Sequence, residues 1–287
     1  RIAVDAKRCP VIDEADMTLM AYLSDRDVVT AQGPDTEVYL HGQISQNVDD
    51  MLDGESRLSF LLEPKGNIES CFRITRLRKD DYLLDTEVGH GQFLCASLER
   101  FKLRSKTEFV SREWKMISVF GDSETVDVSP GAISIRSSWL SPHHLDLLAE
   151  ELTVDLPEYG QDEYERLRYG YGLPVIGKEF QVGSVPNETD LLSLAVSFDK
   201  GCYRGQELVE RIDSRKGGRQ LVRRIRSDVA LAVKDPLFED GQKVGEVLAV
   251  ASSPTYLGFA SVKSQVETLT TESGEPVKFS SLSKVLS

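Results

Sequence analysis

The octapeptide Lys-Gly-Cys-Tyr-Arg-Gly-Gln-Glu at residues 200–207 is the most distinctive stretch of this 287-residue chain. Its two glycines, Gly201 and Gly205, permit a tight loop in which the backbone approaches its neighbours closely and φ can be positive. From Gln206 onward apolar residues recur at helical spacing, at Leu208, Val209 and Ile212. Cys202 therefore lies just before the N-terminus of a predicted helix.

Cys202 is a candidate reactive residue. Lys200 and Arg204 flank it at two residues on either side, and nearby cations and the positive end of a helix both favour a thiolate. Each unit by which the pKa of a thiol falls stabilises the thiolate by about 1.4 kcal/mol. A free cysteine is also often a small core residue, so the chemistry alone leaves a reactive thiol and a structural one equally open.

Basic residues gather from this loop onward. Residues 204–226 hold eight basic and three acidic side chains, whereas the whole chain has 34 Lys and Arg against 47 Asp and Glu, a net charge of −13. This asymmetry suits an anion, whether a carboxylate, a phosphate or an RNA backbone. A solvated linker with ion pairs to the acidic remainder explains the same charges and is the interpretation that we favour. The overall acidity argues against nucleic-acid binding by the whole surface but leaves room for a local basic patch.

Several classes of protein are excluded by what the sequence lacks. No apolar run approaches the roughly 18–20 residues that span a bilayer, and residues 1–7 lack the apolar region of a secretory signal. The cysteines, Cys9, Cys71, Cys95 and Cys202, are too scattered for a disulfide scaffold or a zinc site, so we expect no metal and a reducing, cytoplasmic setting. Phosphate-loop, zinc-protease, serine-hydrolase and dinucleotide-binding motifs are absent from the sequence.

The first part of the chain predicts strands and helices in an irregular order. Apolar runs and turn residues predict strands at residues 27–30, 57–62, 68–77, 82–85, 107–110 and 116–120. Helical spacing predicts helices that begin near residues 33–37 or cover residues 91–101, 145–152 and 162–169. Because a helix does not follow each strand, this order predicts an α+β fold and not a doubly wound parallel sheet.

A domain boundary is predicted at the polar segment Ser-Arg-Lys-Gly-Gly, residues 214–218, whose composition is that of a flexible linker. Beyond it, short strand-like runs separated by turns lie at residues 221–225, 244–250, 256–262 and 277–279. No strong helical pattern follows residue 213. The C-terminal part is thus predicted to be a small all-β module, either a barrel or a sandwich.

The octapeptide resembles the signature K-G-C-Y-x-G-Q-E of the YgfZ family, which is related to the T-protein (aminomethyltransferase) of the glycine cleavage system. Four further segments resemble that family in the same order along the chain, at residues 33–43, 61–66, 164–177 and 186–198. The resemblance implies an α+β folate-binding body, residues 1–215, followed by a small C-terminal β-barrel, residues 216–287. The β-rich C-terminal part predicted from the strand-like runs and turns agrees with this division.

The resemblance also implies a function. It suggests an accessory factor that binds tetrahydrofolate, or another reduced folate, and takes part in the assembly or repair of iron–sulfur clusters. The clients would include radical enzymes that modify tRNA, and neither a membrane nor a nucleic-acid partner is expected. The resemblance assigns the reactive role to Cys202. The candidate folate contacts are Lys200, Gly201, Tyr203, Gln206, Arg168, Glu69 and Asp85.

The chain departs from the T-protein at its catalytic carboxylates. T-proteins carry an Asp-Asp pair where this chain has Glu69 and Ser70, and an Asn that aligns with Asp85. A catalytic carboxylate must lie within about 3 Å of the proton that it handles, so one additional methylene matters. Arg168 aligns with an Arg of the T-protein and could pair either with a ligand carboxylate or with a glutamate nearby on its own helix. These departures weaken the prediction of an aminomethyltransferase.

Three functions remain after this comparison. We favour the folate-binding accessory factor. A folate-dependent aminomethyltransferase is the second, so whether the chain is an enzyme stays open. The third is an interaction module that binds no folate and contacts a partner or RNA through the basic residues 204–226. Folate affinity separates the first two from the third, and sustained turnover separates the second from the first.

Overall fold

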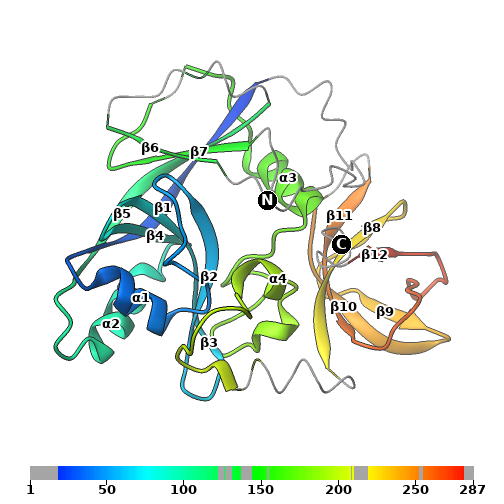
Figure 1. Cartoon of the computed structure of the whole chain (residues 1–287). Coiled ribbons are helices and arrows are strands. Elements are labelled where there is room, and N and C mark those ends of the chain that lie inside the picture. The colour runs from blue at the N-terminus through cyan, green and yellow to red at the C-terminus, as the bar shows by residue number, and fades with distance from the viewer. Residues whose placement is uncertain are drawn as a thin grey trace. The chain divides into compact units, whose positions relative to one another are not determined.

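The computed structural model describes residues 19–121, 126, 131–136, 144–153, 155–207, 209, 219–251 and 255–280. Contacts divide the chain into two compact units. Unit 1 comprises Arg1–Asp13, Gly160–Ser193 and Glu207–Ser287, and unit 2 comprises Glu14–Tyr159 and Leu194–Gln206. Figure 1 shows that each unit is built around its own β-sheet.

Unit 2 contains a seven-stranded sheet in which neighbouring strands are antiparallel. The strands in spatial order are β2 (Ser56–Leu62), β3 (Ile68–Arg78), β4 (Asp81–Thr86), β1 (Met20–Gln32), β5 (Glu108–Phe120), β7 (His144–Ala149) and β6 (Ile133–Ile135). The two central strands β1 and β5 each have 13 residues and pair along their whole length. Alternating side chains of these strands therefore supply both faces of the sheet.

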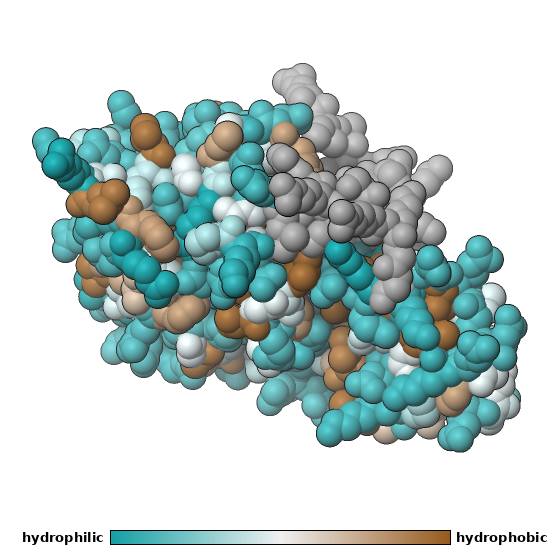
Figure 2. Space-filling view, turned by 90° about the horizontal axis from the view of Figure 1, so that it is seen from below, coloured by the Kyte–Doolittle hydropathy of each residue, from teal (hydrophilic) through white to brown (hydrophobic). Residues whose placement is uncertain are grey.

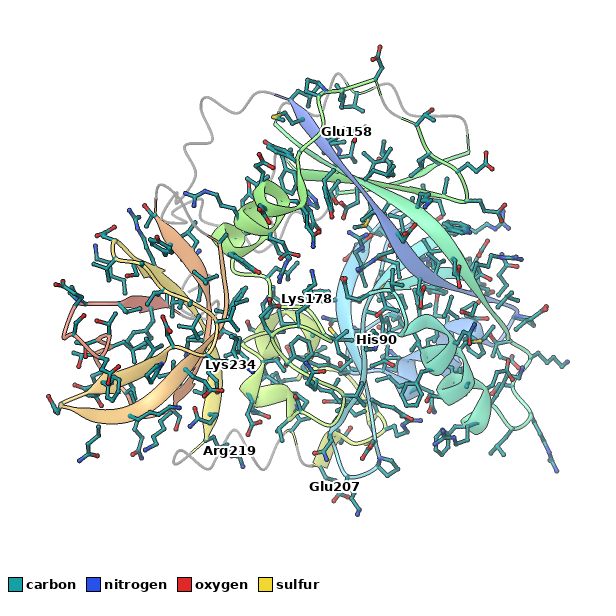
Figure 3. The ribbon with its side chains drawn as sticks, turned by 180° about the vertical axis from the view of Figure 1, so that it is seen from behind. His90, Glu158, Lys178, Glu207, Arg219 and Lys234 are labelled. Carbon is teal, nitrogen blue, oxygen red and sulfur yellow. The ribbon has the colours of Figure 1, made fainter. Side chains whose placement is uncertain are left out.

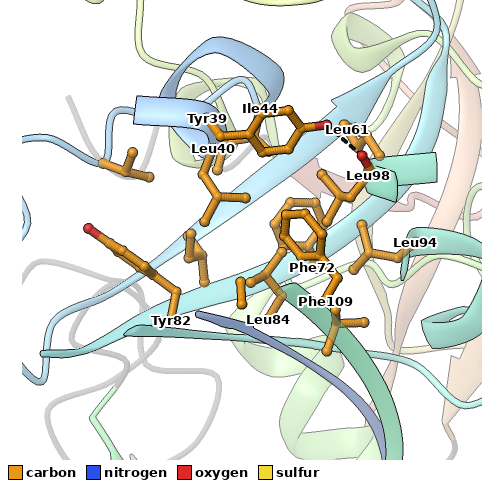
Figure 4. Close-up of a cluster of buried hydrophobic side chains, with 14 of the residues drawn as sticks. Tyr39, Leu40, Ile44, Leu61, Phe72, Tyr82, Leu84, Leu94, Leu98 and Phe109 are labelled. Carbon is orange, nitrogen blue, oxygen red and sulfur yellow. Dashed lines mark hydrogen bonds between the residues drawn. The ribbon is translucent and has the colours of Figure 1, made fainter. Parts of the chain in front are cut away.

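Two helices of unit 2, α1 (Thr36–Gln43) and α2 (Gly91–Phe101), pack against one face of the sheet. The α2 helix begins where the carboxylate of Asp27 on β1 accepts the N–H groups of Gly89 and Gly91, at 3.0 and 2.7 Å. Figure 4 shows the core between the helices and the sheet, in which the Tyr39 hydroxyl donates to the Leu98 carbonyl. The fully buried members of this core include Val29, Leu40, Ile44, Leu61, Ile74, Leu84, Leu94 and Leu98. Burial of each such aliphatic side chain contributes about 1.5–3 kcal/mol.

In its described ranges, unit 1 contains a five-stranded antiparallel sheet and the helix α3. The strand order is β12 (Lys278–Ser280), β8 (Gln220–Ser227), β11 (Tyr256–Lys263), β10 (Gln242–Ala251) and β9 (Pro236–Glu239). The α3 helix (Gln161–Tyr171) carries two acids in its first turn and ends at Gly172, whose φ is 75°. It packs on the sheet through Tyr169, whose ring meets that of Phe259 edge-on at 5.6 Å. The short helices η3 (Pro186–Glu188) and α4 (Leu192–Ala195) follow it along the chain.

Most predicted elements are confirmed. The helices predicted at residues 91–101 and 162–169, the helix start at 33–37 and the four C-terminal strands are all present. The strands predicted at residues 107–110 and 116–120 form the single strand β5, and β9 was not predicted. The linker at residues 214–218 lies outside the described residues, as do Leu208 and Ile212. The predicted domain boundary between residues 215 and 216 stays a prediction.

The helix predicted at residues 145–152 is wrong, because this segment forms strand β7. Leu145 and Leu147 join one hydrophobic cluster, whereas Leu148 joins another. Asp146 lies between them in a buried polar network. A strand that is buried on both faces gives a continuous apolar run, and periodicity alone does not separate such a run from a buried helix.

The face in Figure 2 is mainly hydrophilic, with hydrophobic residues scattered over it. Of the helices whose bounds the structure describes, the longest are α2 and α3, with 11 residues each. Within the described ranges, no helix combines the length and the hydropathy that a bilayer crossing requires.

Candidate functional site

The octapeptide at residues 200–207 forms a loop that is fixed to the end of α1. Lys200 Nζ donates hydrogen bonds to the carbonyl oxygens of His41, Ile44 and Gln46, at 2.6, 2.8 and 2.9 Å. The last carbonyls of a helix lack partners within the helix and form its negative end, so an ammonium group is well placed here. Burial lowers the pKa of Lys200 to about 8, and the ammonium remains the main form at pH 7. Its Nζ also lies 5.1 Å from the ring centroid of Tyr203.

Gly205 provides the close backbone approach that the sequence predicts for this loop. Its φ is 80°, and a Cβ atom added there would lie 2.4 Å from the Glu63 carbonyl oxygen and 2.8 Å from Leu62 Cβ. A side chain at this position would therefore collide with the turn after β2. Gly201 differs, because its φ is not positive and an added Cβ would meet only His41 Nε2, at 3.8 Å.

Arg204 joins the loop to β3 and α2. Its Nη2 forms an ion pair with Glu69, and its Nε donates to the Leu62 carbonyl at 2.5 Å. The Arg204 and Glu69 side chains are 9% and 6% exposed. Glu69 also accepts a hydrogen bond from Ser97 Oγ at 2.7 Å, and the guanidinium carbon of Arg204 lies 4.5 Å from the ring centroid of Phe101. The carboxylate of Glu69 is thus held between the loop and α2.

Cys202 is exposed, whereas Cys71 is buried and Cys95 is half-buried. Gln206 braces the turn around it, since its Oε1 accepts the Tyr203 N–H at 2.7 Å and its Nε2 lies 3.7 Å from the Cys202 sulfur. The Lys200 and Arg204 side chains, whose charges were expected to favour a thiolate, instead bind carbonyls and Glu69. What distinguishes the Cys202 thiol is its access to solvent on a braced loop.

Asp85 lies apart from this loop, in a buried polar network on β4. Its oxygens accept hydrogen bonds from Arg26 Nε at 2.8 Å and from Arg73 Nε and Nη2 at 2.9 and 3.1 Å. Burial would lower the pKa of the Arg73 guanidinium, but Asp85 and Asp146 outweigh it and raise that pKa above its ordinary value. The Asp85 side chain is fully buried, so both of its oxygens serve internal ion pairs.

Arg168 belongs to unit 1, on α3. Its five N–H groups donate to the Glu165 and Glu179 carboxylates and to the Leu173 carbonyl. The pairing with Glu165 is the internal ion pair that the sequence offered as the alternative to a ligand carboxylate. A ligand contact from Arg168 stays a prediction, and it would require one of these partners to be displaced.

The structure brings six of the eight predicted site residues together in unit 2. Five lie in the loop at residues 200–207, whose last residue, Glu207, is labelled in Figure 3. Glu69 joins them through Arg204, whereas Asp85 lies in the separate network and Arg168 lies in unit 1. The predicted set omitted Ser97 and Phe101 on α2 and the carbonyl acceptors at the end of α1 and just after it. No local sequence signal marks them, because Lys200 and its acceptors are separated by 154–159 positions.

The fit of these residues to a reduced folate is uneven. Four of the candidate contacts use their charged groups inside the protein, and these are Lys200, Glu69, Asp85 and Arg168. As they stand, these four side chains offer no free charge to a ligand. Gly201 is exposed, and Tyr203 and Gln206 are half-buried. Across the described residues, no group of three or more His, Cys, Asp and Glu side chains is placed to hold a metal ion.

Comparisons with known proteins extend the likeness beyond the octapeptide. No family model matches the chain. The chain is 28% identical over 265 residues to the tRNA-modifying protein YgfZ of Photorhabdus laumondii, which covers 81% of this chain and 80% of that protein. It is 24% identical over 277 residues to the protein of the same name from Colwellia psychrerythraea, with 85% and 84% covered.

A solved structure confirms the fold. The glycine cleavage system aminomethyltransferase T of Bartonella henselae matches with a TM-score of 0.73 over 91% of this chain and 85% of that chain, at 17% identity. Identity at this level shows the fold alone, and it confirms the predicted α+β architecture with a barrel-like C-terminal sheet. The relatives and the solved structure each cover more than four fifths of the chain. This chain is therefore a relative of the YgfZ proteins that has the fold of the glycine cleavage T-protein, as the octapeptide predicted.

Proposed function

We propose that the chain is a tetrahydrofolate-binding accessory factor that supports iron–sulfur enzymes of tRNA modification in the cytoplasm. The names of its relatives support the link to tRNA modification, and the T-protein fold supports the link to a reduced folate. The observation that carries the proposal is the exposed thiol of Cys202 on a loop that buried contacts hold on both sides.

The exposure of Cys202 favours a chemical role over a structural one. A cysteine that served only as a small core residue would be buried, as Cys71 is. The loop around Cys202 is fixed by three hydrogen bonds from Lys200 and by the buried ion pair of Arg204. Each such hydrogen bond from a charged group contributes about 1.5–3 kcal/mol. A thiol that is both accessible and held in place is ready to meet a ligand or a partner protein.

We propose that the folate contacts the exposed part of the loop. Gly201, Tyr203 and Gln206 would contact the ligand directly, since Gly201 is exposed and Tyr203 and Gln206 are half-buried. Lys200 and Glu69 would position that surface through their internal hydrogen bonds and ion pair. Folate contacts from Asp85 and Arg168 would need their internal ion pairs to be displaced. We further propose that residues 1–215 carry the folate function and that residues 216–287 form a separate C-terminal domain.

An aminomethyltransferase activity receives no support from the site. Glu69, which aligns with the first aspartate of the T-protein pair, is bound by Arg204 and Ser97. Ser70 replaces the second aspartate and is fully buried. Sustained turnover of a methylamine-lipoyl substrate that disappears in Glu69→Gln would nevertheless establish this activity and replace the accessory role.

The test combines a binding measurement with a measurement in cells. Calorimetric titration with tetrahydrofolate, under anaerobic reducing conditions, compares the wild type with Cys202→Ala and with Cys95→Ala as the matched control. We expect micromolar binding, about −8 kcal/mol, for all three proteins. The modification level of cellular tRNA is then measured by mass spectrometry in cells that lack the protein and carry each variant.

We expect Cys95→Ala to restore the modification and Cys202→Ala to fail, because the latter removes the exposed thiol without loosening the loop. Absence of tetrahydrofolate binding by all three proteins would remove the folate part of the proposal. Full restoration by Cys202→Ala would show that the thiol has no chemical role.

A further inference from the structure

We propose that residues 100–106, together with Arg204, bind single-stranded RNA beside the loop at residues 200–207, here called the signature loop. This inference rests on the proposed function for the choice of RNA as the polyanion, and it adds a surface that this function does not use. The segment, here called the basic segment, reads Arg-Phe-Lys-Leu-Arg-Ser-Lys and holds four cations and no acid in a chain whose net charge is −13.

The basic segment is on the surface of unit 2, at the C-terminal end of α2. The opposite end of the same helix begins after His90, which Figure 3 labels. The Arg100 side chain is 60% exposed, and Leu103 is 93% exposed at a φ of 47°. Arg104 and Lys106 are also exposed. After the end of α2 the segment is therefore a loop with exposed cations and one exposed apolar residue, Leu103.

Two of its cations are not explained by the helix. Basic residues in a last turn stabilise the negative end of the helix, and this accounts for Arg100 and for Lys102, which pairs with Glu99 at 2.7 Å. The effect falls off within the last turn, so it does not extend to Arg104 and Lys106. Neither of these two has an ion-pair partner in the part of the chain that the structure describes.

A second observation points to an anion at the same place. Arg204 Nη1 is buried and has no hydrogen-bond partner among the described residues, although Nε and Nη2 are engaged. A buried donor without a partner costs about 1–3 kcal/mol, so an oxygen acceptor supplied by a ligand would be favourable there. Arg204 occupies the open position of the signature K-G-C-Y-x-G-Q-E, so the feature belongs to this chain and not to the signature.

The aromatic ring between these cations favours RNA over a simple anion. The Arg204 and Arg100 guanidinium carbons lie 4.5 and 5.9 Å from the centroid of the Phe101 ring, which is 36% exposed. Proteins bind single-stranded RNA by stacking bases on aromatic rings and guanidinium planes while Lys and Arg contact the phosphates. The overall acidity of the chain led us to expect no nucleic-acid partner. A local cationic site is compatible with the net negative charge of the chain. Salt screens the repulsion from exposed acidic residues that lie more than about 8–10 Å from the site.

The test is fluorescence anisotropy of the full-length protein with a labelled 12-nucleotide oligouridine. The charge-reversal variant Arg104→Glu/Lys106→Glu changes two exposed cations that form no ion pair with any residue the structure describes. The matched control is Arg112→Glu/Lys79→Glu, which reverses one exposed Arg and one exposed Lys elsewhere in unit 2. Both variants carry the same net charge, so their difference reports on position alone.

For four phosphate contacts, the wild-type log–log slope of affinity against salt is expected to be about −3, since each contact on a single strand contributes about −0.7. The affinity should then fall about fifty-fold between 50 and 200 mM salt. Reversal of Arg104 and Lys106 should reduce this slope by about 1.4, whereas the control should leave it unchanged. Phe101→Leu should weaken binding about five-fold or more and keep the slope, because it removes a stacking face and no charge.

Four results would overturn the inference. These are no binding by the wild type, equal losses in the two charge-reversal variants, saturation of the site by inorganic phosphate alone at low millimolar concentration, and binding of phosphatidylserine vesicles in place of oligouridine. Tetrahydrofolate titration of the same preparations separates the two proposals. Folate binding without RNA binding removes this inference and leaves the proposed function intact.

Discussion

The signature loop contains two glycines, Gly205 and Gly201, of which only Gly205 should lose much stability when it is replaced by alanine. Gly205→Ala places a Cβ 2.4 Å from the Glu63 carbonyl oxygen at a φ of 80°, whereas Gly201→Ala meets its nearest atom at 3.8 Å. Gly54 is a matched control in the same unit, with a φ of 81° and no atom within 4 Å of an added Cβ. The three variants therefore separate the strain of a positive φ from the effect of the close approach.

The expected magnitudes follow from these distances. A non-glycine residue in the left-handed region costs about 1–2 kcal/mol, and this applies to both Gly54→Ala and Gly205→Ala. Gly205→Ala also requires the turn after β2 to move by about 1 Å to reach an ordinary contact, and overpacking of this kind costs about 1–3 kcal/mol. The total loss for Gly205→Ala is about 2–5 kcal/mol, a large part of the ~5–15 kcal/mol that stabilises a typical domain. Gly201→Ala should stay within about 1 kcal/mol of the wild type.

Urea unfolding provides the assay. In a Trp139→Phe background, which leaves Trp114 of β5 as the remaining tryptophan, fluorescence reports on the sheet of unit 2, and linear extrapolation gives the free energy of unfolding. We expect the free energy of unfolding to be highest for the wild type and Gly201→Ala, lower for Gly54→Ala and lowest for Gly205→Ala. Equal midpoints for Gly54→Ala and Gly205→Ala would show that the signature loop does not approach the turn after β2, and would refute the reasoning.

Three further predictions concern the charges and thiols. Arg204→Met and Glu69→Gln should each lower the free energy of unfolding by about 3 kcal/mol because the partner stays buried; the double variant should lose at least about 1 kcal/mol less than the sum, as a double-mutant cycle measures. Burial would raise the pKa of Asp146, but His144 and Arg73 outweigh it and hold that pKa well below its ordinary value. The carboxylate therefore stabilises the fold above about pH 4 and loses this effect as the pH falls, so acid unfolding followed by circular dichroism should be shallower in Asp146→Asn. Iodoacetamide should modify Cys202 at least about ten-fold faster than Cys71, because burial raises the pKa of Cys71 to about 12; peptide mass spectrometry measures both rates, and equal rates would contradict the exposed loop.

The sequence predicted those elements whose pattern is local. The bounds of α2 agree with the prediction because Leu94 and Leu98 recur at helical spacing and face the core. The strand β7 was predicted as a helix because both of its faces are buried, so its residues show no alternation. The octapeptide at residues 200–207 could also be recognised, because its residues are contiguous in the sequence, and it predicted the fold.

The contacts that build the site could not be predicted in the same way. Arg204 and Glu69 are 135 positions apart, and their pairing depends on how α2 and the sheet place β3 beside the loop. Lys200 was predicted to act on Cys202, its near neighbour in sequence, but its ammonium group binds carbonyls in the last turn of α1 and just after it. The partners of long side chains such as those of Lys200 and Arg204 depend on how the backbone brings distant segments together. The order of residues in the sequence does not reveal these contacts.

The composition of unit 2 from two separate segments has a consequence for its biosynthesis. The segment that carries Lys200 and Arg204 belongs to unit 2, yet 34 residues of unit 1 are translated between Tyr159 and Leu194. At about 5–20 residues per second, roughly 2–10 s pass between the synthesis of Tyr159 and that of Gln206. During this interval the synthesised part of unit 2 contains α1 and Glu69 but not yet Lys200 and Arg204, the cations that bind them. The segment that carries the signature loop is thus the last part of unit 2 to be synthesised. A ribosome that pauses within residues 160–193 would hold unit 2 incomplete, and chaperones could bind it in that state.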